Sequence, residues 1–222
     1  VGLPAVDDAQ RTLALLEGYG CDVETSCCAT SSGMAAIMSA VEPFLVRFPG
    51  REHEPVSYAQ LQRSVVALAA AMRSNGVQEG DLVASLLPNV PDALVAMLAS
   101  ASLGALWFAC PSGLSASAAG ELLAPLAPKM LLVGDGAALP DLELPGLAAL
   151  LFVPGREPSG ALPAGAIAVA DFVAPFVDAE LEFTVVAFDH PLYLTRAVLP
   201  ANRGEVLVHG TGGTLIQHLK EL

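Results

Sequence analysis

The feature that most restricts the fold of this chain is a run without any charged residue, residues 93–120. Its first part, residues 93–110, has about the 18 apolar or neutral residues that suggest a membrane span. Ser100 and Gly104 interrupt that part, Pro111 ends it, and no Lys or Arg flanks it as membrane spans require. We therefore expect a buried helix followed by a buried strand. A membrane-associated chain is the weaker alternative, which cell fractionation would detect.

Helix and strand patterns alternate on both sides of this run. Ser57 and Gln60 have the spacing of a capping box, and apolar residues then repeat at helical intervals. Strands that alternate with helices across short turns form right-handed crossovers. We therefore predict an α/β fold with a mostly parallel, doubly wound sheet that is buried on both faces. The predicted strands are residues 82–87, 105–109 and 130–133, and the predicted helices are residues 57–75, 91–103 and 115–126.

The second half of the chain has weaker patterns. Pro, Gly and Ala dominate residues 136–183, in which we expect a strand over 148–153 and a short helix near 171–177. Near the end we expect a strand over 206–208, then a glycine-rich turn, then a helix from Thr214. No internal repeat is visible.

Charge and cysteine content exclude several classes of function. The net charge is −13, which argues against a general nucleic-acid binder, because phosphate contacts need clustered Lys and Arg. The four cysteines form no C-x-x-C pair, so zinc and dithiol redox motifs fail, and we expect free thiols in a reducing, cytoplasmic setting. His209 and His218 are too far apart in sequence for ligands on one helix face, so we expect no metal site. The N-terminus shows no signal peptide.

Several motifs within residues 56–222 resemble those of one enzyme family. Residues 57–61, 80–81, 87–93 and 101–107 are similar to the acyl-adenylate-forming ligases in general. Two later blocks are more specific to the acetoacetyl-CoA synthetase branch of that family. They are Phe188-Asp189-His190-Pro191-Leu192-Tyr193 and residues 208–220, which begin Val208-His209-Gly210-Thr211.

The resemblance implies an activity and a domain plan. The family ligates a carboxylic acid, here acetoacetate, to coenzyme A through an acyl-adenylate, with ATP split to AMP and pyrophosphate and with Mg²⁺ present. On this basis residues 1–33 are a segment without a family match, and residues 34–222 are part of an AMP-binding domain. We expect no nucleic-acid partner.

The chain departs from the family between the two specific blocks. There the family has its phosphate loop, Tyr-Ser-Ser-Gly-Thr-Thr-Gly followed by a Pro and a Lys, whose N–H groups, hydroxyls and positive charge hold the ATP phosphates. This chain lacks that chemistry, and Glu205 stands about where the lysine would be, so the charge is reversed. The altered positions are Thr195, Arg196, Ala197, Val198, Leu199, Pro200, Ala201, Asn202, Arg203, Gly204 and Glu205.

The genetic code suggests an origin for this departure. The DNA tac-tcg-agc-ggt-act-acc-ggc encodes Tyr-Ser-Ser-Gly-Thr-Thr-Gly. When it is translated one base later, it gives Thr-Arg-Ala-Val-Leu-Pro-Ala, which is the sequence of residues 195–201. Our hypothesis is that this segment is the family phosphate loop translated in a shifted frame, with the frame restored before Val208.

Other expectations follow from the same resemblance. His209, Gly210 and Thr211 either lie near a nucleotide or acyl pocket or simply form a turn between a strand and a helix. Pro111, Ser112 and Gly113 also depart from the family pattern. Because family members continue far past the last block with their adenine and ribose motifs and a catalytic lysine, we expect an inactive fragment with no catalytic residue of its own. The alternative is a non-catalytic binding or regulatory protein that keeps the α/β scaffold.

Overall fold

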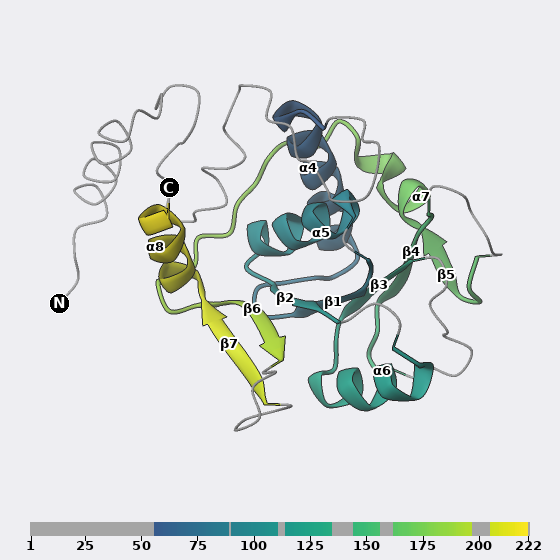
Figure 1. The fold of residues 1–222 in the computed structure, drawn as a ribbon. Helices are drawn as coiled ribbons and strands as arrows, with labels where there is room; N and C mark the ends of the chain where they lie inside the picture. Colours follow the sequence, from purple (N-terminus) through teal and green to yellow (C-terminus); the bar gives the residue numbers. More distant parts are fainter. Residues whose placement is uncertain are drawn as a thin grey trace.

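A computed structural model describes residues 56–88, 90–110, 114–134, 144–155, 162–196 and 205–221. Residues 1–33, which we predict to be a segment without a family match, lie outside the described residues. Figure 1 shows one sheet with helices on both of its faces. Of the described helices, none has the length and hydropathy needed to cross a bilayer, and the one within the uncharged run has 12 residues.

The first described helix, α4 (Tyr58–Ser74), begins at the predicted capping box. The Ser57 hydroxyl accepts from the Gln60 N–H at 3.3 Å, and the Gln60 side chain accepts from the Ser57 N–H at 2.8 Å. These two bonds satisfy N–H groups that a helix start otherwise leaves without partners. The helix ends at Asn75, before Gly76 with its positive φ.

The described strands form one sheet of seven, in the order β5-β4-β3-β1-β2-β6-β7. All neighbouring pairs are parallel except β6 and β7, which are antiparallel. This confirms the predicted mostly parallel α/β fold. The strands are β1 (Leu82–Leu86), β2 (Leu106–Ala109), β3 (Met130–Gly134), β4 (Ala149–Val153), β5 (Ala166–Ala168), β6 (Pro191–Arg196) and β7 (Val206–Gly210).

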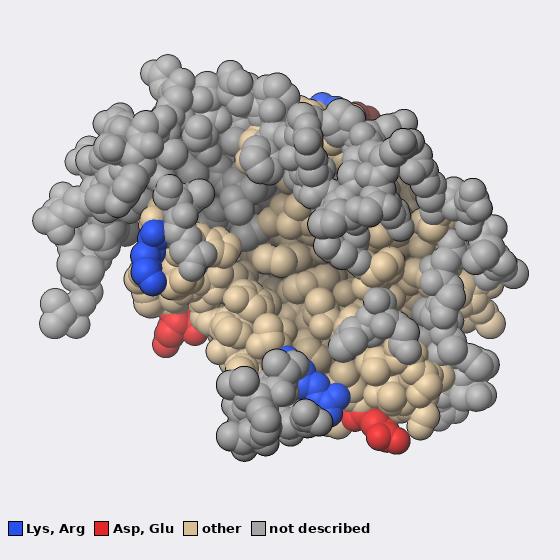
Figure 2. Space-filling view, viewed as in Figure 1, with Lys and Arg blue, Asp and Glu red and all other residues tan. Residues whose placement is uncertain are grey.

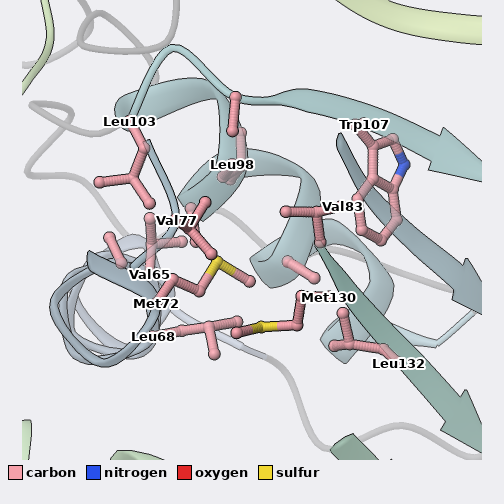
Figure 3. Packing of buried hydrophobic residues seen from close by; sticks show 14 of the residues in the cluster. Val65, Leu68, Met72, Val77, Val83, Leu98, Leu103, Trp107, Met130 and Leu132 are labelled. Carbon is pink, nitrogen blue, oxygen red and sulfur yellow. The ribbon is translucent and has the colours of Figure 1, made fainter. Parts of the chain in front are cut away.

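Two apolar layers cover the sheet, which confirms the doubly wound prediction. On one face α4, α5 (Pro91–Ser102) and α7 (Val169–Val173) cover it, and Figure 3 shows Leu68 and Met72 of α4 pointing toward Met130 of β3. On the other face α6 (Ala116–Leu123) covers a second cluster, which includes the fully buried Phe108. The uncharged run contains most of α5, all of β2 and the first part of α6, so it contributes to both layers and to one inner strand, which explains its lack of charge.

The structure corrects several predicted boundaries. The sequence patterns did not predict β5 or β6, because β5 is only three residues long and β6 begins at a proline. Helix α6 ends at Leu123, and the predicted remainder is the 3₁₀ turn Ala124–Leu126 with Pro125 inside it. Helix α8 (Thr211–Glu221) begins before Thr214, and the short helix near 171–177 is α7 followed by the 3₁₀ turn Ala174–Phe176.

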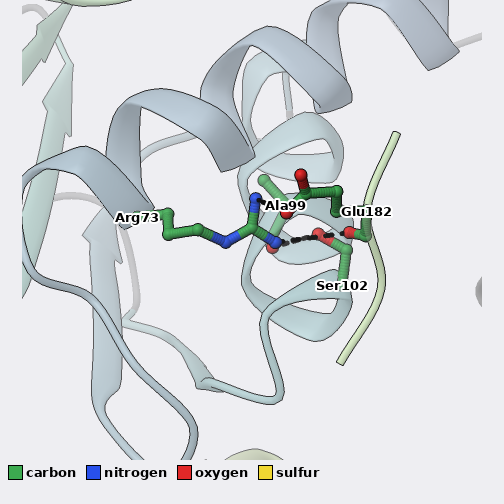
Figure 4. Close-up of polar contacts among 4 residues, drawn as sticks. All are labelled: Arg73, Ala99, Ser102 and Glu182. Carbon is green, nitrogen blue, oxygen red and sulfur yellow. Dashed lines mark hydrogen bonds and ion pairs between the residues drawn. The ribbon is translucent and has the colours of Figure 1, made fainter. Parts of the chain in front are cut away.

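A long connection, residues 177–190, links the 3₁₀ turn Ala174–Phe176 to β6 and packs against the ends of α4 and α5. Arg73 of α4 lies 2.9 Å from the Glu182 carboxylate and donates to the Glu182 carbonyl at 3.5 Å (Figure 4). The Thr184 N–H donates to the Ser102 carbonyl at 2.8 Å. The ring Nε2 of His190 donates to the Gly104 carbonyl at 2.8 Å. The connection is therefore anchored at three points before β6 begins.

Candidate functional site

The candidate site is the end of the β6–β7 hairpin at the carboxyl edge of the parallel strands. Tyr193 pairs with Trp107 of β2 and Leu194 with Phe108, so β6 runs parallel to β2 and ends at the same edge. In open α/β sheets, ligands bind beyond the carboxyl ends of the strands. Strand β6 ends and β7 begins at this edge, where a ligand of such a sheet would bind.

The structure places the predicted loop residues in three ways. Thr195 and Arg196 belong to β6, where they pair with Leu207 and Val206 of β7. Residues 197–204 lie outside the described residues. Glu205 is exposed and comes directly before β7. The part of the segment that can be described thus continues the strand rather than the loop.

His209 is held between two side chains of the neighbouring strand. Its ring stacks on Tyr193, with centroids 4.4 Å apart and planes 12° apart. Its Nε2 is hydrogen-bonded to the Thr195 hydroxyl at 2.9 Å. The antiparallel register causes this arrangement, because Tyr193 lies opposite His209. The sequence patterns singled out His209 and Thr195 and included Tyr193 only in a family motif, because without a predicted β6 its position opposite His209 could not be inferred.

The amino end of α8 is already capped by the chain itself. The N–H groups of Thr211 and Gly212 donate to the carbonyls of His190 and Phe188, both at 2.8 Å. The buried Thr211 hydroxyl also donates to the His190 carbonyl, at 2.9 Å. A helix start binds anions through N–H groups that have no other partner. These two N–H groups are therefore not free to bind a phosphate, which favours a structural role for Gly210 and Thr211.

Positive charge is sparse around the hairpin. Figure 2 shows Lys and Arg on the described part of this face as separate side chains, not as a cluster. Within the described ranges no three His, Cys, Asp or Glu side chains come together as a possible metal site. Cys110, at the end of β2, is a free and buried thiol whose pKa burial raises to about 12. It therefore stays protonated and is a poor nucleophile.

Comparison with known proteins decides the family. The family model described as "AMP-binding enzyme" matches residues 34–164, more than half of the chain. The chain belongs to the AMP-binding enzyme family. The match includes α4, α5, α6 and strands β1 to β4, which are four adjacent inner strands of the sheet.

Relatives of this AMP-binding enzyme chain include acetoacetyl-CoA synthetases. The protein so named from Rhizobium meliloti (strain 1021) is 34% identical over 193 residues, which are 77% of this chain and 29% of that protein. The one from Xenopus tropicalis is 32% identical over 194 residues, 78% of this chain and 29% of its own length. The chain therefore spans less than a third of these relatives.

A solved structure agrees with the sequence relatives. Acetoacetyl-CoA synthetase from Streptomyces lividans superposes with a TM-score of 0.70 at 28% sequence identity. The superposition covers 96% of this chain and 31% of that protein. The α/β fold of the described residues thus agrees with that of a solved acetoacetyl-CoA synthetase.

Gly212 provides a local test of how α8 docks on the hairpin. A methyl group at Gly212 would overlap the Phe188 ring, whereas one at Gly213 would meet no atom within 4 Å. We expect Gly212→Ala to lower the free energy of unfolding by about 1 kcal/mol, because the exposed Phe188 ring must move away. Gly213→Ala should raise it by up to about 1 kcal/mol through helix propensity.

Urea unfolding of the two variants measures this difference. Adding Phe188→Ala to Gly212→Ala should restore most of the lost stability. If Gly212→Ala and Gly213→Ala change the unfolding free energy equally, the described packing of Phe188 on α8 is wrong.

Proposed function

We propose that this chain carries the scaffold of an acetoacetate–CoA ligase but does not itself form an acyl-adenylate. Membership of the AMP-binding enzymes and the named relatives support the ligase scaffold and acetoacetate as the parent substrate. The observation that carries the proposed inactivity is the segment 195–205. Its first two residues end β6 at the carboxyl edge of the sheet, yet the whole segment has only one glycine, one hydroxyl and no lysine, whereas the family loop has more glycines, more hydroxyls and a lysine to hold a triphosphate.

The described residues of the hairpin do not fit ATP or its Mg²⁺. The first N–H groups of α8 are occupied by backbone carbonyls. The carboxylate of Glu205 would repel the triphosphate, and the Thr195 hydroxyl is already hydrogen-bonded to His209. We derive no catalytic step through ATP, Mg²⁺ or coenzyme A for this chain.

The shifted-frame hypothesis extends beyond the seven residues that suggested it. Asn202, Arg203 and Gly204 can be encoded aac-cga-gg, where any base may follow. Read one base earlier, these codons give a variable residue, then ccg for Pro, then agg for Arg. A Pro and a basic residue are what the family has at those two positions. The other frame can therefore encode the Pro and a basic residue of the family, so the hypothesis also accounts for the missing positive charge.

Pyrophosphate–ATP exchange in the presence of acetoacetate tests the proposal. We expect no exchange from the purified chain, because residues 195–205 do not contain the Ser-Ser-Gly-Thr-Thr-Gly sequence whose N–H groups and hydroxyls stabilise the leaving pyrophosphate in the family. A sharper version of this experiment measures exchange by a variant of the Streptomyces lividans enzyme in which residues 195–205 of this chain replace the phosphate loop.

The graft separates the loop from the rest of the scaffold. Loss of one positioned donor costs about 10²–10³ in rate, so the grafted enzyme should lose at least about 10³ of its exchange rate. A graft that substitutes the family sequence instead is the matched control and should keep full activity. Exchange by the chain as given, or more than a tenth of the activity in the graft, would overturn the proposed inactivity.

A further inference from the structure

Strand β7 is an outer strand of the sheet, and its far side pairs with no described strand. It is the last strand in the sheet order, and Figure 1 shows α8 beyond its tip. Val206, Leu207 and Val208 are 37%, 40% and 60% exposed, whereas β1 and β3 are buried throughout. Because successive side chains of a strand point to opposite faces, both faces of β7 carry exposed aliphatic side chains.

This edge lacks two of the features that usually stop a strand from pairing with another chain. An outer strand presents a row of N–H and C=O groups, and proteins protect it with charged residues, prolines or a very short length. The opposite outer strand, β5, is only three residues long. The five residues of β7 include no Lys, Arg, Asp, Glu or Pro. The edge of β7 can therefore accept an added strand.

The sequence around β7 is symmetric in charge and size. Glu205, Val206, Leu207, Val208 and His209 form a pattern with Leu207 at its centre. In an antiparallel pair of two identical strands, a two-fold axis relates the strands and every contact occurs twice. With that axis at Leu207, each valine would lie opposite a valine and each Glu205 opposite a His209. A carboxylate accepts hydrogen bonds and an imidazole N–H donates them, so both ends of the pair would be complementary.

The described structure already orients the two ends of this pattern. Glu205 is exposed and comes directly before β7. The His209 ring is fixed by its stack on Tyr193 and by the bond between its Nε2 and the Thr195 hydroxyl. That bond does not use Nδ1, so the ring keeps a second nitrogen for a carboxylate.

We propose that two copies of this chain associate by antiparallel pairing of β7 with β7, with a two-fold axis at Leu207. The occupant of the open edge is thus a second copy, because the symmetric pattern of β7 complements itself. The two sheets then become one continuous sheet across the dimer. A five-residue strand pair is a small interface between chains that each carry a net charge of −13. We therefore expect a weak dimer, with a dissociation constant of about 10–100 µM.

Sedimentation equilibrium of the full chain, at concentrations from about 1 to 300 µM, tests the pairing. We expect a monomer–dimer equilibrium in the parent chain. Leu207→Lys places two cations at the two-fold axis and should weaken association at least about tenfold, because like charges opposite each other destabilise strand pairs. Glu205→Lys removes both contacts between a carboxylate and an imidazole and should weaken association about fivefold.

Glu180→Lys is the matched control for net charge. Glu180 is exposed on the 177–190 connection, away from the hairpin, and its substitution changes the net charge as much as Glu205→Lys does. Because a smaller net charge reduces repulsion between copies, this variant should associate at least as tightly as the parent.

The fluorescence of Trp107, the sole Trp of the chain and a buried one, checks that each variant is folded. If Leu207→Lys disrupts the fold, Val208→Lys at the more exposed neighbouring position replaces it and should still weaken association severalfold. A chain that stays monomeric at about 300 µM, or a dimer that the folded lysine variant leaves unchanged, would overturn the proposal. So would a Glu205→Lys variant that associates as tightly as Glu180→Lys, or an assembly larger than a dimer, which would indicate head-to-tail contacts.

Discussion

Phe108→Ala is expected to lower the free energy of unfolding by about 3–5 kcal/mol. Phe108 is 1% exposed and lies in the middle of β2, between Ala84 of β1 and Leu194 of β6. Its ring fills the layer under α6, where truncation leaves a cavity that β-strands cannot close. Domains of this size are stable by about 5–15 kcal/mol, so this variant should be largely unfolded at moderate urea concentrations. Urea titration followed by Trp107 fluorescence measures the loss.

Phe188→Ala is the matched control for this truncation. Phe188 is 66% exposed, so the same change removes little buried surface and should cost less than about 1 kcal/mol. Equal losses in the two variants would show that β2 is not a central strand of the sheet.

Gly104→Ala should cost about 2–4 kcal/mol of unfolding free energy. Gly104 has φ +68°, a conformation that costs residues with a Cβ about 1–2 kcal/mol. An added methyl would also lie 3.0 Å from Val186 Cγ1 and 3.1 Å from Glu79 Cγ. The methyl would push the 177–190 connection away from Gly104, whose carbonyl accepts the hydrogen bond from His190. Both effects act on the anchor that precedes β6.

Gly76→Ala separates the two effects. Gly76 has φ +83° but no atom within 4 Å of an added methyl, so only the backbone cost of about 1 kcal/mol applies. Urea unfolding of the two variants gives the comparison. A Gly104→Ala loss no larger than that of Gly76→Ala would contradict the close packing of the connection on Gly104.

Local sequence signals predicted most of the central sheet. These signals depend only on residues close together in the sequence. They are the capping box at Ser57, the helix end at Asn75 and the apolar runs of β1 and β3. β6 was missed although Leu192 and Leu194 alternate with more exposed residues, because Pro191 weakened the strand pattern.

Arrangements that depend on register or on packing between elements could not be predicted. The stack of Tyr193 on His209 requires the antiparallel pairing of β6 with β7. The capping of α8 by Phe188 and His190 requires the path of the long connection. The burial of Asp92 could not be predicted either, because it arises from elements that meet only in the folded structure.

Our central proposal is that residues 195–201 are the family phosphate loop translated in a shifted frame. The pairing of β6 with β2 and of β7 with β6 supports it, since both flanks keep the register of the sheet. Reading the genomic and transcript sequence across codons 193–208 tests the claim directly. We predict that an alternate frame there encodes Ser-Ser-Gly-Thr-Thr-Gly followed by a Pro and a basic residue. The absence of that string from every frame would contradict the account.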